Sequence, residues 1–206
     1  MKKKLIFLTV IVLTITVFYS KIKNYISPSL QNFPVITSQE SDKDVPYEVV
    51  EVARGLFVPW SIVFTSQDRI LIAERDGKIR IIQNGKLHEK PLITFSEISS
   101  GSEEGLMGLT TDPNYKTNKF LYASYAYTKD STIVVKIVRL IDQDRVITMD
   151  KVLIDNIPAA HFHAGSRIRF GPDGKLYITT GDGTQKQLAQ NLDSLVGKIL
   201  RINSDG

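Results

Sequence analysis

From position 46 onward, the chain alternates between short apolar runs and polar turns. The runs are rich in β-branched and aromatic residues, and Gly, Asp, Asn and Pro separate them. Runs of this kind are typical of strands joined by tight turns. Helical periodicity is limited to one turn around Lys186–Leu195, so the pattern predicts an all-β domain. The strands that we expect are Tyr47–Ala53, Ser61–Phe64, Ile70–Glu74, Ile79–Gln83, Gly108–Thr111, Phe120–Tyr127, Thr132–Ile141, Val152–Ile154, Arg167–Phe170, Leu176–Thr180 and Ile199–Ile202.

These apolar runs also repeat as a phrase. The segments IVF (62–64), RILI (69–72) and GKIRI (77–81) recur as IRF (168–170), KLYI (175–178) and GKILRI (197–202). The first members lie 106 positions apart (168 minus 62), which is two units of 53, and a looser copy that begins at Leu109 fits between them. Blades of a β-propeller recur at about 40–50 residues, so the repeat predicts three blades. A β-sandwich with chance similarity between its strands is the alternative.

The N-terminal segment 1–23 has a different pattern. Lys2–Lys4 precede an uncharged run of 16 residues, Leu5–Ser20, and Lys21 and Lys23 follow it. This length falls between the core of a signal peptide and a membrane-spanning helix, and no clear cleavage site follows. The flanking lysines fit the positive-inside rule and argue against a buried helix. We therefore expect an uncleaved hydrophobic anchor helix, with a cleaved signal as the alternative, and an extracytoplasmic location for the rest of the chain.

Charge and composition exclude several classes of function. The net charge is +4, but five lysines lie in the first 24 residues, which leaves 21 basic against 22 acidic residues in the remainder. That balance gives no electrostatic signal for nucleic-acid binding. The chain has no Cys, which excludes disulfides, thiolate metal sites and a catalytic thiol. Residues 24–45 are polar and contain Pro28 and Pro34, so we interpret them as a linker that leads into a domain at 46–206.

Two of the three histidines lie in the segment AHFHAGSR (160–167). In an extended segment, His161 and His163 would point to the same face, because side chains at i and i+2 share a face. Such a pair could hold a metal ion, although no third ligand lies nearby in the sequence. Two solvated loop histidines are the simpler alternative.

A third interpretation makes one histidine a general base that a carboxylate holds in its working tautomer. Asp182 follows the strand Leu176–Thr180, which we expect to form a hairpin with Arg167–Phe170 through the turn Gly171–Gly174. The hairpin would bring His163 and Asp182 to the same edge of a blade. Asp182 could instead be a turn-forming residue within Gly-Asp-Gly.

Several motifs resemble the soluble PQQ-dependent sugar dehydrogenases, the glucose/sorbosone dehydrogenase family. The resemblance covers about 46–206, which is essentially the whole expected domain. The motifs are VPWSIVF (58–64), AERDGKIR (73–80), EEGLMGL (103–109), DPNY (112–115), HAGSR (163–167), GPDGKLYITTGD (171–182), AQN (189–191) and LVGKILRI (195–202).

The resemblance implies a six-bladed β-propeller that oxidises an aldose at C1 to the lactone by hydride transfer to PQQ, with a non-oxygen electron acceptor. His163 matches the general base and Asp182 its carboxylate partner. Glu103 and, less directly, Gln187 match residues that bind the sugar, and Arg167 we interpret as structural. Phe162 stands where some sugar-oxidising members have an acidic residue, which speaks against glucose as the substrate.

Family members continue well beyond the equivalent of Gly206. By the resemblance, their later blades carry the residues that bind PQQ and most ligands of a calcium ion. We therefore expect about three of six blades, as in a truncated and inactive copy or a fragment. A lactonase-type propeller hydrolase and a non-catalytic interaction propeller are the rival functions. The presence of both His163 and Asp182 favours the dehydrogenase.

Overall fold

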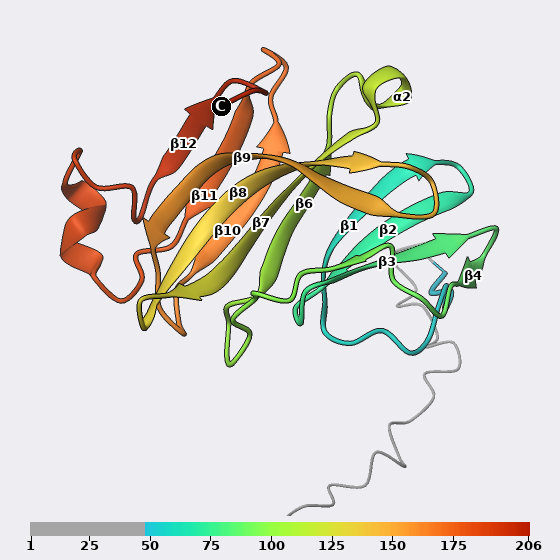
Figure 1. The fold of residues 1–206 in the computed structure, drawn as a ribbon, viewed down its shortest axis with the longest axis horizontal. Coiled ribbons are helices and arrows are strands. Elements are labelled where there is room, and N and C mark those ends of the chain that lie inside the picture. The colour runs from blue at the N-terminus through green and yellow to red at the C-terminus, as the bar shows by residue number, and fades with distance from the viewer. Residues whose placement is uncertain (1–47) are drawn as a thin grey trace, which may run out of the picture. The chain divides into compact units, whose positions relative to one another are not determined.

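The computed structural model describes residues 48–206, and residues 51–206 form one compact unit. Its strands belong to three antiparallel sheets, here called A, B and C, which follow one another along the chain (Figure 1). The expected anchor at 1–23 and the linker at 24–45 lie outside the described residues. No helix within residues 48–206 is long and apolar enough to cross a membrane.

Sheet A contains the first copy of the repeat. Its strands β1 (Pro59–Ser66), β2 (Arg69–Glu74) and β3 (Lys78–Gln83) pair in chain order. Two short strands, β4 (Lys86–Leu87) and β5 (Ile93–Thr94), both pair with β3, so they share the fourth row of the sheet.

Sheet B contains the middle copy and has the longest strands. Strands β6 (Leu106–Thr111), β7 (Phe120–Lys129), β8 (Thr132–Asp142) and β9 (Ile147–Pro158) pair in chain order. The short helix α2 (Tyr115–Asn118) connects β6 to β7.

Sheet C contains the last copy. Strands β10 (Gly165–Phe170), β11 (Leu176–Thr180) and β12 (Ile199–Ile202) pair in chain order, and the 3-10 helix η1 (Lys186–Gln190) lies in the long connection before β12. The three copies of the sequence phrase thus form three successive sheets.

The first strands of the three sheets lie next to one another, since β6 contacts both β1 and β10. Arg167 on β10 joins all three, because its guanidinium donates to the carbonyl of Trp60 at 3.0 Å and to that of Met107 at 3.5 Å. The side chain of Arg167 therefore holds the inner strands together, in the manner of adjacent propeller blades.

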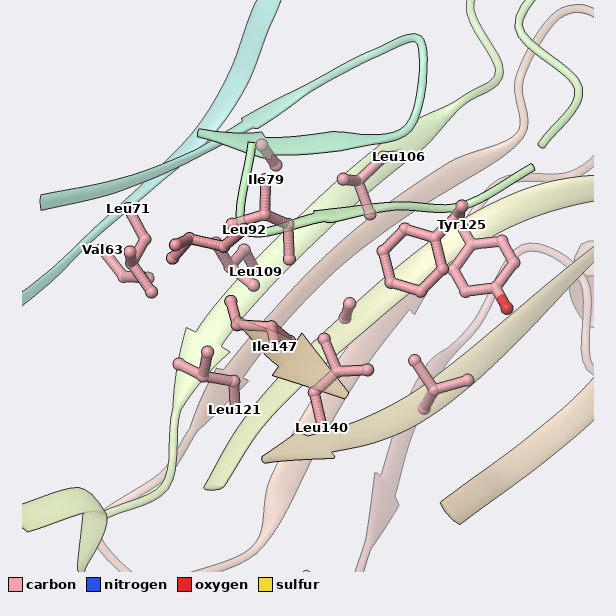
Figure 2. Packing of buried hydrophobic residues seen from close by; sticks show 14 of the residues in the cluster. Val63, Leu71, Ile79, Leu92, Leu106, Leu109, Leu121, Tyr125, Leu140 and Ile147 are labelled. Atoms are coloured by element: carbon pink, nitrogen blue, oxygen red, sulfur yellow. The ribbon is translucent and has the colours of Figure 1, made fainter. Parts of the chain in front are cut away.

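The core has two parts, one on each side of sheet B. The first packs sheet A against sheet B and includes Leu71, Ile79, Leu109, Leu121 and Leu140 (Figure 2). The second packs sheet B against sheet C and includes Met107, Tyr122, Ile137, Ile168 and Ile178. Alternate side chains of sheet B enter opposite parts of the core, as the twofold period of a strand requires.

Ten of the expected strands coincide with observed strands, so the all-β prediction is confirmed. The expected strand Tyr47–Ala53 is wrong for its described part, since residues 48–53 form no strand. Its valines favour extended backbone, but a strand needs a hydrogen-bonded neighbour, and these residues have none in the described chain. The strand expected at Val152–Ile154 is much longer, as β9, because its polar residues face solvent at the edge of sheet B.

Candidate functional site

The candidate site lies at one end of sheet C, where β10 begins and β11 ends. Gly165 pairs with Thr180 in the hairpin, so the residues just outside the hairpin meet. His163 Nδ1 lies 2.9 Å from Asp182 Oδ1. The structure thus brings together the two residues proposed from the sequence as base and orienting carboxylate.

Asp182 is held in its ionised form. The hydrogen bond from His163 lowers the pKa of the Asp182 carboxyl, and a second bond from the N–H of Thr184 to Oδ1, 2.9 Å long, adds to the effect. An ionised carboxylate can only accept, so Nδ1 of His163 carries the shared hydrogen. In neutral His163 the free electron pair then lies on Nε2, the atom suited to accept a proton.

The backbone of His163 is fixed as firmly as its ring. Its φ is +56°, in the left-handed region that non-glycine residues rarely adopt. The carbonyl of His163 accepts the N–H of Gly183 at 3.1 Å, and its N–H donates to Glu103 Oε2 at 2.8 Å. A Cβ at position 181 would lie 1.7 Å from the His163 carbonyl oxygen, so the close approach of the two loops requires Gly181.

Beside His163 and Asp182 lies an open hollow of about 630 Å³. One wall comes from the connection between β11 and β12, which Lys198 holds in place. Its ammonium group donates three hydrogen bonds to carbonyl groups of that connection, those of Leu188, Ala189 and Val196. The remaining residues of the lining are Gly165, Thr179, Thr180, Gly181, Gly197 and Ile199.

The two residues expected to bind the sugar lie differently. Glu103 is close to His163, but one of its carboxylate oxygens already accepts the His163 N–H, which leaves Oε1 to face another group. Gln187 is exposed on η1, and neither Gln187 nor Glu103 is among the residues that line the hollow. A role for either residue in binding the sugar stays a prediction.

The expectation that His161 and His163 share a strand face is wrong. Residues 161–163 form bends, and the positive φ of His163 breaks the alternation of an extended chain. The Nδ1 atom of His161 lies 2.7 Å from Oε1 of Glu104, so each histidine has its own carboxylate. Within residues 48–206, no group of three or more His, Cys, Asp or Glu is arranged to hold a metal ion.

Sequence reasoning missed two residues of this region, Glu104 and Lys198. Glu104 stands beside the predicted Glu103, but a second glutamate in a loop gives no sign that its carboxylate is buried. Lys198 belongs to the repeated phrase Gly-Lys-Ile, in which the equivalent residue is Lys78. That repetition could have indicated a structural role.

The chain is similar to known proteins in both sequence and fold. A family model described as Glucose / Sorbosone dehydrogenase matches residues 56–206. A solved structure of an oxidoreductase (glucose dehydrogenase) from Thermus thermophilus is 40% identical, with a TM-score of 0.71, and the match covers 76% of this chain and 47% of that one.

Two further similarities differ in the function that they indicate. The PQQ-bound form of Aldose Sugar Dehydrogenase from Streptomyces coelicolor is 30% identical, with a TM-score of 0.69, over 75% of this chain and 47% of that one. Hedgehog-interacting protein from Mus musculus is 29% identical over 180 residues, or 76% of this chain and 26% of the mouse protein. The chain thus spans about half of the two solved structures and a quarter of the mouse protein.

Proposed function

Because the chain belongs to the glucose/sorbosone dehydrogenase family, we propose that it oxidises an aldose at C1 to the lactone with PQQ as the oxidant. A carrier or dye other than oxygen would then take up the electrons. The observation that carries the proposal is the His163–Asp182 pair at the rim of an open hollow. The similarity to a PQQ-bound aldose sugar dehydrogenase supports the choice of substrate class and cofactor.

In this proposal, His163 is the general base. Asp182 holds Nδ1, so Nε2 accepts the proton of the C1 hydroxyl group as that carbon is oxidised. Glu103 is the substrate-binding group in this proposal, because its carboxylate is bonded to the backbone of the base and its Oε1 atom has no hydrogen-bond partner among the described residues, so that it can accept from a sugar hydroxyl. Its Oε2 atom meanwhile supports the backbone of His163.

The described residues fit the base side of such a site but not the cofactor. PQQ carries carboxylates that need cationic partners. Of the cations near sheet C, Lys198 lines the hollow but its ammonium group is bound to three backbone carbonyls, and Arg167 is not among the lining residues. We therefore derive no contact to PQQ from residues 48–206. The resemblance also implies a calcium ion, which we include in this proposal. Ca²⁺ is therefore added in the assay described below.

A non-catalytic binding role is the second candidate, which the similarity to Hedgehog-interacting protein favours. A binding module would not need the carboxylate of Asp182 beside the ring of His163. The aligned pair and its fixed backbone support the enzyme instead, because proton transfer needs a base that is held in one tautomer and one position.

The experiment is an assay of the full chain loaded with PQQ and Ca²⁺, with a series of aldoses and an artificial electron acceptor. His163→Ala should lower the oxidation rate by about 10²–10⁴-fold, the usual contribution of a positioned base. Asp182→Asn should lose less, because it disturbs the tautomer of His163 without removing the ring. His88→Ala is the matched control, since His88 is an exposed histidine next to sheet A.

Two results would refute this function. In the first, the loaded chain reduces no acceptor with any aldose but hydrolyses a lactone, which would indicate the rival hydrolase. In the second, His163→Ala and His88→Ala have equal rates, which would show that His163 is not the base.

We also propose that the protein is exported and acts outside the cytoplasmic membrane, anchored or secreted. The support is the sequence pattern of Lys2–Lys4 followed by the uncharged run Leu5–Ser20. A reporter fused to the C-terminus should be active only outside the membrane. Activity confined to the cytoplasm would refute export.

A further inference from the structure

Glu104 is a buried carboxylate with a full set of hydrogen-bond donors. Its side chain has no exposed surface. Oε1 accepts hydrogen bonds from Ser99 Oγ at 3.2 Å, from the Gly101 N–H at 2.8 Å and from His161 Nδ1 at 2.7 Å. Oε2 accepts the Ser102 N–H at 2.8 Å. Burial acts to raise the pKa of Glu104, but these bonds outweigh it and lower the pKa below its usual value.

Glu103 continues the same contact by one residue. Its N–H donates to the carbonyl of His161 at 3.0 Å, and its Oε2 accepts the N–H of His163 at 2.8 Å. The two successive glutamates therefore hold both histidines. Glu104 binds the ring of His161, and Glu103 binds the backbone of both His161 and His163. Both glutamates precede β6 of sheet B, whereas both histidines precede β10 of sheet C.

This loop of sheet B is itself tied to sheet A. The guanidinium of Arg75 donates to the carbonyl of Ser102, and the N–H of Leu106 donates to the carbonyl of Arg75 at 3.0 Å. At Gly105, φ is +151°, and a Cβ would lie 2.3 Å from the Arg75 carbonyl oxygen. The loop thus has a fixed support from which to hold the histidines.

We propose that Glu104 is a positioning residue for His163: it fixes His161 and the loop before β6, so that Glu103 can hold the His163 backbone in its left-handed conformation. Without this support, the only remaining backbone hydrogen bond of His163 in the described chain is the one from Gly183. The inference rests on the proposed function for its meaning in catalysis, but its physical content can be measured without activity.

The test is hydrogen exchange of the His163 amide, measured by NMR on the full chain. Glu104→Gln keeps the shape of the side chain but turns an amide donor toward either the Ser102 N–H or the donors at Oε1. The His163 amide should then exchange about tenfold faster or more, because its bond to a charged acceptor is loosened. Amides in the middle of β7 should keep their rates.

Glu74→Gln is the matched control. Glu74 is also a fully buried glutamate that accepts a backbone N–H, that of Phe57, and it also faces a basic side chain, Arg80, but it lies on sheet A and has no contact with the histidines. We expect Glu74→Gln to leave the His163 amide unchanged. If both variants accelerate its exchange equally, Glu104 is a structural residue only and the proposal is wrong.

A pair of variants at His161 tests the same link without altering the buried carboxylate. His161→Asn keeps a side-chain N–H near the position of Nδ1, whereas His161→Leu removes the donor from a mostly exposed site. Exchange at His163 should stay slow in His161→Asn and become faster in His161→Leu. Unchanged exchange in both His161→Leu and Glu104→Gln, with the fold intact, would overturn the proposal.

Assays of the loaded chain separate this inference from the proposed function. If the chain oxidises an aldose, Glu104→Gln should lower kcat by about tenfold, because the base is displaced, and should also raise KM, because Glu103 moves with the same loop. If the chain oxidises no aldose but exchange at His163 responds as expected, the proposed function fails and the positioning role of Glu104 stands.

Discussion

Sheet B and its neighbours come from the same repeated phrase, yet their first strands differ in burial. In β6, the first strand of sheet B, five successive residues are buried, Leu106–Thr110. In β1 of sheet A only Val63 is buried, and in β10 of sheet C buried residues alternate with others. Sheet B packs on both faces, whereas sheets A and C each pack on one. Burial is therefore set by a sheet's place in the stack rather than by its sequence phrase.

The largest effect should come from the buried charges that join sheet A to sheet B. The guanidinium of Arg69 on β2 donates to both carboxylate oxygens of Asp142 on β8, and Tyr115 also binds this carboxylate. Asp142→Ala leaves the buried guanidinium without its partner and should lower the free energy of unfolding by about 3–5 kcal/mol. Urea denaturation measures the change.

The control for that variant is an ion pair at the surface of sheet C. Asp173 accepts from Arg201, Tyr177 and the N–H of Lys175, and its side chain is 35% exposed. Asp173→Ala should therefore lower the free energy of unfolding much less than Asp142→Ala does, because water can replace the bonds that are lost. Equal losses for Asp142→Ala and Asp173→Ala would contradict the distinction between the junction and the surface.

The second effect compares one residue type in the two environments. Ile137 in β8 has no exposed surface, and Ile199 in β12 is 75% exposed. Ile137→Ala should cost about 2–5 kcal/mol, because it leaves a cavity between closely packed sheets. Ile199→Ala should change the free energy of unfolding by less than about 0.5 kcal/mol. A large loss at Ile199 would show that the outer face of sheet C is covered in solution.

A third, smaller effect concerns pH and the tyrosines of sheet B. Burial, with a bond to Asp112, raises the pKa of Tyr122 to about 12. Above pH 10 the unfolded chain releases this proton while the folded chain keeps it, so stability falls as the pH rises from about 10 to about 12. Tyr122→Phe should make the unfolding free energy fall less steeply with pH in this range, by up to the contribution of about one proton. An unchanged slope would show that Tyr122 is solvated.

The smallest effect should be found on the open face of sheet A. Phe64 is 66% exposed and lines an apolar groove of about 530 Å³ with Ile62, Ile70 and Ile72. Phe64→Lys should alter the free energy of unfolding by less than about 0.5 kcal/mol but weaken binding of the dye ANS, which senses exposed apolar surface. A strong loss of stability would mean that this face is part of a core.

Much of the fold could be predicted from the sequence because strand and turn signals are local. The hairpin between β10 and β11 needs only its two apolar runs and the turn Gly171–Gly174, and that hairpin was enough to place His163 near Asp182. The conformation of the loop before β6 could not be predicted in this way. It depends on the contact between Glu104 and His161, which lie 57 positions apart.

Local signals also failed where pairing decides the structure. The valines at 49, 50 and 52 have the composition of a strand but no partner among the described residues. In β9 the reverse holds, since Lys151 is a poor strand former that pairs with Arg139 of β8 at an edge, and Asp150 beside it lies at a register shift within the same strand. For both segments the neighbouring strand, and not the segment itself, determines the outcome.

The groove on sheet A also makes the chain a natural optical probe. Trp60, the only tryptophan in the sequence, lines this groove, and its carbonyl oxygen accepts the hydrogen bond from Arg167. Indole emission moves to shorter wavelength when water leaves its surroundings. The tryptophan fluorescence of the protein therefore reports from one place, and any molecule or chain segment that covers the outer face of sheet A will produce a blue shift without a label.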